Sequence, residues 1–218
     1  MALAIFDLDN TLIAGDSDHS WGEFLVQQGI VDANHYKQCN DQFYRDYQNG
    51  SLDMRAYLQF ALKPLAENSP ETLQALRRQF LNDIIQPMHL PKAQALLQQH
   101  RQAGDFILVI TSTNRFVVEP ICTQLEVDEL IATEPEQVNG RYTGDIVGEP
   151  SYRGGKVIRL NEWLGATGRS MKGASFYSDS INDLPLLEIV DRPVAVDPCN
   201  SLKAEAEKRG WEIISLRS

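Results

Sequence analysis

The sequence contains no long hydrophobic stretch, and this absence limits where the protein can work. None of its apolar runs approaches the about 18 residues that a membrane-spanning helix needs. Its N-terminal segment, MALAIFDLDN, has neither the basic part nor the long apolar part of a secretory signal. We therefore expect no export signal and no membrane partner for this 218-residue chain.

Cysteine and positive charge are also scarce. The three cysteines, Cys39, Cys122 and Cys199, are far apart and form no Cys-x-x-Cys pair. This is typical of free thiols in a reducing compartment and predicts a cytoplasmic location. The formal net charge is −10, whereas a sequence-independent nucleic-acid binder needs a basic face. Nucleic acid is therefore not an expected partner, and an anionic substrate would need a local positive site such as a metal ion or a lysine.

Short apolar runs alternate with helical patterns along most of the chain. Buried strands are expected at residues 2–6, 106–111, 129–133, 174–179, 193–197 and 211–216, and helices at residues 92–104, 117–125, 154–165, 182–190 and 200–210. Asn139-Gly140 is a hairpin turn signal between two short extended pieces. The alternation predicts an α/β fold, a Rossmann-like doubly wound parallel sheet with helices on both faces.

The segment from about residue 20 to residue 86 interrupts this alternation. It shows helical spacing and no convincing strand, and Ser69 followed by Pro70 looks like a helix start. We therefore expect an α/β core of residues 1–14 and 88–218, with a helical domain of residues 15–87 inserted after the first strand. Its aromatic side chains at helical spacing are expected to form its interior: Tyr36, Phe43, Tyr44, Tyr47 and Tyr57.

Polar side chains that could take part in catalysis or in metal binding follow the expected strands or open a helix. They are Asp7, Asp9, Thr111, Ser112, Lys156, Asp179 and Asp183. In open α/β sheets, ligands bind at the carboxyl ends of the strands, so these side chains should converge. Four carboxylates at one sheet edge would repel one another unless a cation lies between them.

Mg²⁺ is the cation that this donor set predicts, because Mg²⁺ prefers oxygen ligands. The four histidines show none of the spacings that are typical of zinc sites. A hydroxyl from Thr111 or Ser112 can bind a phosphate oxygen, and Lys156 can offset the charge of a nucleophile and of a phosphate. Together these groups suit the transfer of a phosphoryl group through a carboxylate nucleophile.

The same residues carry a resemblance to a known family. The stretch DLDNT, the strand ending in Thr111-Ser112, Lys156 and the stretch SDSINDLPLL resemble, in order and spacing, the haloacid dehalogenase (HAD) superfamily. The stretches LIAGDSDHSWGEFL, NGRYTGDIVG and GGKVIRL resemble its phosphoserine phosphatase-like subgroup, subfamily IB. The resemblance covers essentially the whole chain and implies that the helical insertion is a cap domain.

The resemblance implies a role for each aspartate after the first strand. Asp7 would attack phosphorus and form an aspartyl-phosphate, and Asp9 would protonate the leaving alcohol and then activate water. Dehalogenases and transport ATPases of the superfamily lack an aspartate at the position of Asp9, whereas its phosphatases and phosphomutases keep it. The resemblance therefore favours the hydrolysis of phosphate esters.

The resemblance also implies how the other motifs work. Asp7, the carbonyl of Asp9, and Asp179 would hold Mg²⁺, with Asp183 supporting the metal site or Lys156. Asn182 would donate to bound phosphate or substrate. The family usually presents one hydroxyl after its second motif strand, whereas TSTN offers three; Thr111 is the first choice because it directly ends the apolar run, and Ser112 is its rival.

The expected substrate is a small phosphorylated metabolite. The subgroup includes enzymes acting on phosphoserine and on histidinol phosphate, and both substrates carry an amine that carboxylates near the cap entrance would suit. Asp16, Asp18 and Glu23 are the candidates for the amine, and Trp21 or His19 for a ring, although a solvated face and a core aromatic remain the simpler interpretation. We place histidinol phosphate first and phosphoserine second. The alternatives are a phosphomutase or phosphotransferase on the same core, and a catalytically weak regulatory protein.

Overall fold

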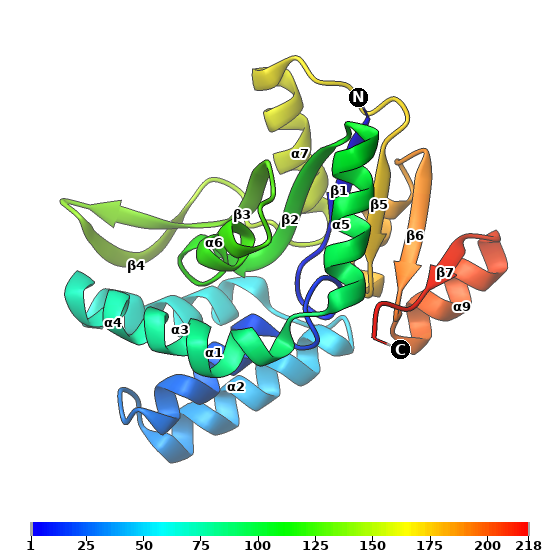
Figure 1. Ribbon diagram of the computed structural model, residues 1–218. Helices are drawn as coiled ribbons and strands as arrows, with labels where there is room; N and C mark the ends of the chain where they lie inside the picture. Colours follow the sequence, from blue (N-terminus) through cyan, green and yellow to red (C-terminus); the bar gives the residue numbers. More distant parts are fainter. Residues whose placement is uncertain (1, 218) are drawn as a thin grey trace.

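A seven-stranded sheet forms the centre of the computed structural model, which describes residues 2–217 (Figure 1). The strands are β1 (Leu3–Phe6), β2 (Phe106–Asn114), β3 (Glu129–Val138), β4 (Arg141–Val147), β5 (Ser175–Ser178), β6 (Arg192–Val196) and β7 (Glu212–Ile214), in the order β4-β3-β2-β1-β5-β6-β7. All neighbouring strands pair in parallel except β3 and β4. These two form the hairpin predicted at Asn139-Gly140, where both residues have positive φ.

Helices cover both faces of the sheet, which confirms the predicted fold class. Along β1, Ala4 and Phe6 face one apolar cluster, whereas Leu3 and Ile5 face another, as the alternation of side chains along a strand requires. Helices α5 (Pro91–Ala103) and α6 (Arg115–Gln124) pack in the first cluster. Helices α7 (Gly154–Thr167), α8 (Leu184–Leu187) and α9 (Asn200–Arg209) pack in the second.

Four helices separate β1 from α5, as the sequence predicts. They are α1 (Ser17–Gln27), α2 (Ala33–Gln48), α3 (Met54–Glu67) and α4 (Pro70–Phe80), followed by short helical turns at Leu81–Ile85 and Gln86–Met88. Each of the four begins after a polar residue whose side chain accepts backbone N–H bonds: Asp16, Asp32, Asp53 and Ser69. Figure 1 shows these helices together at the end of the sheet where β6 terminates.

The helical insertion does not have an apolar core of its own. Trp21 of α1 lies 5.1 Å from the ring of Phe80 and 5.7 Å from the ring of Phe116 in α6, and all three belong to the apolar cluster on the α5–α6 face of the sheet. Helices α1 and α4 are therefore fixed to the core. In contrast, α2 has one buried residue, Asn40. The division into residues 1–14 with 88–218 and residues 15–87 stays a prediction.

Several elements differ from their predicted lengths: β2 continues past residue 111 to Asn114, β7 has only three residues, and two further differences have a clear local reason. The segment 182–190 is a helical turn at Ile181–Asp183 followed by the four residues of α8, rather than one helix. The hydroxyl of Ser180 accepts the N–H of Asn182 and sets this tighter turn. Strand β3 continues to Val138 because its second half pairs with β4. Within residues 2–217, none of the helices has the length and apolarity that crossing a membrane requires.

Candidate active site

The first aspartate after β1 is buried beside Lys156, the one buried lysine among residues 2–217. The N–H of Asp7 donates to the carbonyl of Tyr177 in β5 at 2.9 Å, which fixes the start of the loop against the neighbouring strand. Lys156 Nζ, from the first turn of α7, lies 2.7 Å from Asp7 Oδ1. Burial raises the pKa of Asp7 to about 7, although the charge of Lys156 acts to lower it. The second oxygen, Oδ2, accepts no hydrogen bond within residues 2–217.

Lys156 joins two of the predicted motifs. Its side chain is fully buried, and its Nζ lies 2.7 Å from Asp183 Oδ1 as well as close to Asp7. Burial acts to lower the pKa of Lys156, but the carboxylates of Asp183 and Asp7 outweigh burial and raise it. The Ser178 hydroxyl donates to Asp183 Oδ2 at 2.7 Å. The lysine is therefore a charged bridge between the loops after β1 and β5.

Asp179 is held by a residue that the sequence analysis did not single out. The Thr11 hydroxyl donates to Asp179 Oδ1 at 3.3 Å and accepts the N–H of Asp179 at 3.1 Å. Burial raises the pKa of Asp179 well above its usual value, and the charges of Asp7 and Asp183 raise it further. The signal for Thr11 was its place in DLDNT, but the sequence did not show its partner.

Asp9 points toward the start of α1. Its Oδ1 accepts the N–H of Ser17 at 2.6 Å, and its Oδ2 accepts the hydroxyl of Thr113 at 2.8 Å. Burial raises the pKa of Asp9 to about 7, the charge of Asp16 adds to this, and the bonds from Ser17 and Thr113 oppose it. Thr113 is the third hydroxyl of TSTN, and the sequence analysis considered only Thr111 and Ser112 as the functional one.

Thr111 and Ser112 both border the same pocket as Asp7 and Asp9. The Thr111 side chain is buried, and its hydroxyl accepts the N–H of Thr113 at 3.3 Å. Ser112 is held through its backbone, because its carbonyl accepts the Thr133 hydroxyl at 2.8 Å. The two hydroxyls are therefore both available to a bound anion, and the choice between them stays open.

The donor set at this sheet edge fits Mg²⁺. The charges of Asp183 and Asp9 raise the pKa of Asp7, those of Asp7 and Asp183 raise the pKa of Asp179, and Lys156 is the one positive side chain bonded to these carboxylates in the described chain. Burial raises the pKa values of Asp7 and Asp179, which shows that their negative charge is poorly compensated. A hard dication such as Mg²⁺ prefers oxygen ligands, and these carboxylates have too few cations beside them to balance their charge. The carboxylates of Asp7 and Asp179 are the ones free to hold it, since Asp183 is used by Lys156 and Ser178.

A pocket of about 540 Å³ extends from these residues into the helical insertion. Asp16 and Asp18 line it, as predicted for a substrate amine, and burial raises the pKa of both. No lysine or arginine is among the lining residues of this pocket in the described chain.

Aromatic side chains form much of the wall of this pocket. The sequence analysis assigned Phe43, Tyr44, Tyr47 and Tyr57 to the interior of the insertion. The ring of Phe43 does pack on that of Tyr57 at 5.6 Å, but all four side chains also line the pocket. Tyr36 also follows the prediction, since its ring stacks on Phe60 at 4.3 Å. Helical spacing shows which residues share a face, but it does not show whether that face meets another helix or a cavity.

Trp21 and Glu23 lie outside the pocket, which corrects the expectation that they reach its mouth. Trp21 is 3% exposed and packs in the apolar core. Glu23 faces the outer side of α1, where Lys37 Nζ lies 3.1 Å from its Oε1. Both follow Asp18 within two helical turns, but the rotation of α1 carries them away from the side that Asp18 occupies.

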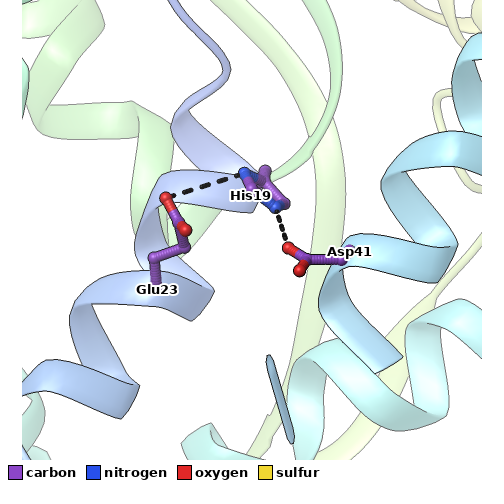
Figure 2. A group of neighbouring side chains, drawn as sticks. All are labelled: His19, Glu23 and Asp41. Carbon is purple, nitrogen blue, oxygen red and sulfur yellow. Dashed lines mark hydrogen bonds and ion pairs between the residues drawn. The ribbon is translucent and has the colours of Figure 1, made fainter. Parts of the chain in front are cut away.

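Figure 2 shows His19 between Glu23 and Asp41, with its Nε2 2.9 Å from Asp41 Oδ1. His19 lines the pocket, as the sequence suggested for a ring contact, and it stacks on Tyr44 at 4.6 Å. These three side chains could together ligate an ion. However, the ammonium of Lys37 already lies 3.1 Å from Glu23 and 3.5 Å from Asp41, so their charge is compensated.

Asn182 has a different partner from the one expected. It was expected to donate to phosphate or substrate, but its Nδ2 donates to the carbonyl of Tyr47 at the end of α2, at 2.9 Å. Its Oδ1 accepts Arg153 Nε at 3.1 Å and the Tyr152 hydroxyl at 3.3 Å. The structure thus uses Asn182 to connect the loop after β5 with the helical insertion. Arg153 was not singled out from the sequence.

Paired aspartates, a buried lysine and an adjoining pocket lie together at the carboxyl edge of a doubly wound sheet, the edge where α/β enzymes bind their ligands. Residues 4–188 match the haloacid dehalogenase-like hydrolase family, and the chain belongs to this family. It is 47% identical over 219 residues to a histidinol-phosphatase from Neisseria meningitidis serogroup C (strain 8013), covering 99% of both chains. In keeping with its relatives, the protein is a phosphatase, and the predicted family and enzyme class are confirmed.

Solved structures give the same fold. A protein of unknown function from Bordetella pertussis Tohama I has a TM-score of 0.93 and 42% identity, covering 99% of this chain and 98% of that one. A phosphoserine phosphatase solved as a phospho-aspartyl intermediate analogue has a TM-score of 0.73 over 99% of this chain and 93% of that one. It is 17% identical to the chain, so this likeness concerns the fold alone.

Proposed function

We propose that this phosphatase hydrolyses histidinol phosphate with Mg²⁺ and through an aspartyl-phosphate on Asp7. The observation that carries the proposal is the single pocket that Asp7, Asp9 and Thr111 share with Asp16, Asp18 and four aromatic rings. One end suits a phosphoryl group, and the other suits an ammonium and a flat ring. The identity of 47% to a histidinol-phosphatase over almost the whole chain supports the same substrate.

The first step is the attack of Asp7 on phosphorus. Because Lys156 binds Oδ1, that oxygen is held and Oδ2 is left for attack. A bond forms from Oδ2 to phosphorus, and the bond from phosphorus to the alcohol oxygen breaks. The leaving alkoxide takes a proton from Asp9, whose pKa of about 7 keeps it partly protonated near neutral pH.

In the second step a water molecule hydrolyses the acyl phosphate. Asp9, now ionised, takes the proton of the water as its oxygen bonds to phosphorus, and the bond from Asp7 to phosphorus breaks. The bonds from Thr113 and Ser17 hold the Asp9 carboxyl in one orientation for both steps. Thr111 or Ser112 binds a phosphate oxygen. When bound by Asp7, Asp179 and the Asp9 carbonyl, Mg²⁺ supplies positive charge to offset that of the phosphoryl oxygens.

The composition of the pocket favours histidinol phosphate over phosphoserine. Both compounds have an amine that Asp16 and Asp18 would attract. Phosphoserine also has a carboxylate, which needs a cation, and the pocket has no lysine or arginine among its lining residues in the described chain. A carboxylate placed beside Asp16 and Asp18 would be repelled, and such like-charge contacts disfavour a ligand by several kcal/mol.

We also propose the organisation and the location of the enzyme. Residues 15–87 would form the cap that selects the substrate, and residues 1–14 and 88–218 the core that carries the chemistry. A cytoplasmic location is supported by three free thiols. The partner would be a small phosphate ester rather than a nucleic acid, in keeping with the net charge of −10.

Phosphate release from a panel of phosphate esters tests the proposal. With Mg²⁺, we expect kcat/KM for histidinol phosphate to exceed that for phosphoserine by about 100-fold or more, and we expect EDTA to abolish both activities. Asp7→Asn should remove turnover and the phosphorylated intermediate, because an amide is a poor nucleophile. A preference for phosphoserine would refute histidinol phosphate as the substrate. Full activity in EDTA would refute the requirement for Mg²⁺. An isomerised product without phosphate release would indicate a phosphomutase.

A further inference from the structure

Helix α2 forms much of the pocket wall but is the least buried helix of the insertion. Asn40, Phe43, Tyr44 and Tyr47 all line the pocket, yet Asn40 is the one buried residue among the 16 of this helix. Segments with few buried contacts open at the lowest free energy. Whether the pocket is closed therefore depends on how α2 is fastened at each end.

The N-terminal half of α2 is fastened to α1. Asn40 Nδ2 donates to the carbonyl of His19 at 2.9 Å, and Asp41 binds the His19 ring (Figure 2). Lys37 adds an ion pair to Glu23 at 3.1 Å. Because α1 itself packs in the core of the protein, this half of α2 has a fixed support.

At the C-terminal end of α2, two side chains from the loops before α7 and after β5 donate to backbone carbonyls; we call these two, Arg153 and Asn182, the latch. Asn182 Nδ2 donates to the Tyr47 carbonyl at 2.9 Å, and Arg153 Nη2 donates to the Gly50 carbonyl. Arg153 Nε also donates to Asn182 Oδ1 at 3.1 Å, so each side chain of the latch orients the other. A Cβ atom at Gly50 would lie 2.8 Å from Arg153 Nη2, which shows how closely the guanidinium approaches the chain.

Both latch residues are close in sequence to the ion pair between Lys156 and Asp183. Arg153 directly precedes α7, which carries Lys156, and Asn182 directly precedes Asp183, which binds Lys156. Arg153 has φ 51° and ψ −121°, a backbone conformation that residues other than glycine rarely adopt. Such conformations persist where surrounding contacts maintain them, and they concentrate at functional sites.

We propose that Arg153 is a positioning residue which, with Asn182, holds the C-terminal end of α2 over the pocket, and that substrate enters when this latch is released. The N-terminal half of α2, which α1 supports, then acts as the hinge, and the C-terminal end of α2, which carries Tyr47, moves. The latch itself follows from the contacts above, whereas its kinetic consequence rests on the proposed phosphatase substrate.

Hydrogen exchange of the free protein tests the latch without any activity. Arg153→Gly removes the guanidinium and relieves the positive φ, so this variant should fold. We expect the amides of residues 44–51 to exchange about 30-fold faster, the change that follows from losing two hydrogen bonds of ordinary net strength. Arg153→Ala should give the same result, and Arg153→Lys, which keeps one donor group, a smaller change.

Arg45→Ala is the matched control, because Arg45 is on α2 but bonds to Gln42 of the same helix. It should leave the exchange of residues 44–51 within about twofold of the wild type, as expected for an exposed side chain away from the latch. Unchanged exchange in both Arg153→Gly and Arg153→Ala would overturn the latch.

Kinetics then test the gating role. Arg153→Gly should raise KM for histidinol phosphate about tenfold with little change in kcat, because the closed state is populated less, and Arg153→Lys should restore part of the loss. Faster exchange with an unchanged KM would overturn gating of the substrate. A wild-type protein that hydrolyses no phosphate ester would refute the proposed function, while the exchange experiment would still decide the latch.

Discussion

Replacing Asp18 by asparagine separates substrate recognition from the stability of the protein. The carboxylate lines the pocket, and the described chain provides no side-chain hydrogen bond to it. Burial raises its pKa well above the usual value, and the charges of Asp16 and Asp9 raise it further. An ammonium group on the substrate would be the missing partner, so Asp18→Asn should weaken the binding of an amine-bearing phosphate ester.

The size of this effect follows from the kind of contact. Two unit charges 4 Å apart attract by about 4 kcal/mol at an effective dielectric constant of 20, and losses of water around both groups offset part of this. A hydrogen bond to a charged group is worth about 1.5–3 kcal/mol net. KM for histidinol phosphate should therefore rise roughly 10- to 100-fold, with kcat almost unchanged, because the contact is equal in the bound substrate and in the transition state.

The same substitution should raise the Tm of the free enzyme at neutral pH. The pKa of Asp18 is higher in the folded state than in the unfolded state. At pH values where Asp18 is ionised in the unfolded chain, this carboxyl therefore lowers the stability of the fold. Asparagine removes that penalty. The gain in Tm should vanish as the pH falls below about 4, the ordinary pKa of an aspartate, where the wild-type side chain is protonated in both states.

Glu67→Gln is the matched control for Asp18→Asn, because Glu67 lies in the same helical insertion but pairs with Lys63 on the exposed side of α3, outside the pocket. It should leave KM almost unchanged. The measurements are initial rates of phosphate release for histidinol phosphate and for p-nitrophenyl phosphate, which has no amine, together with thermal melts at several pH values. Equal losses with both substrates, or equal losses in both variants, would refute recognition of the amine by Asp18.

Two further variants test the core of the site. Thr113→Val removes the hydroxyl that orients Asp9; we expect kcat to fall roughly 10- to 100-fold with little change in KM, and an unchanged kcat would show that Ser17 alone positions Asp9. Lys156→Met leaves the carboxylates of Asp7 and Asp183 buried without their cation; urea unfolding should show a loss of about 3–5 kcal/mol, whereas Lys37→Met, at an exposed ion pair, should leave the midpoint nearly unchanged. Equal urea midpoints for the two lysine variants would contradict this account of Lys156.

The order of the motifs along the chain determined the core of the site. Asp7, Lys156, Asp179 and Asp183 each follow an apolar strand or open a helix, and parallel strands bring their carboxyl ends to one edge. Local sequence was therefore sufficient to predict the fold class, the hairpin at Asn139-Gly140 and the convergence of these groups. The contacts of Lys156 with Asp7 and Asp183 follow from that topology.

The tertiary structure alone decided which side chains line the pocket. The spacing of Tyr44 and Tyr47 was correct for a helix face, but only the placement of α2 across the sheet edge makes that face a pocket wall. Trp21 follows the loop of Asp7 and Asp9 closely in sequence, yet the rotation of α1 buries it in the apolar core. The partners of Arg153 lie 29 and 103 positions away in the chain. Such contacts depend on the relative positions of whole elements, which no local pattern of residues encodes.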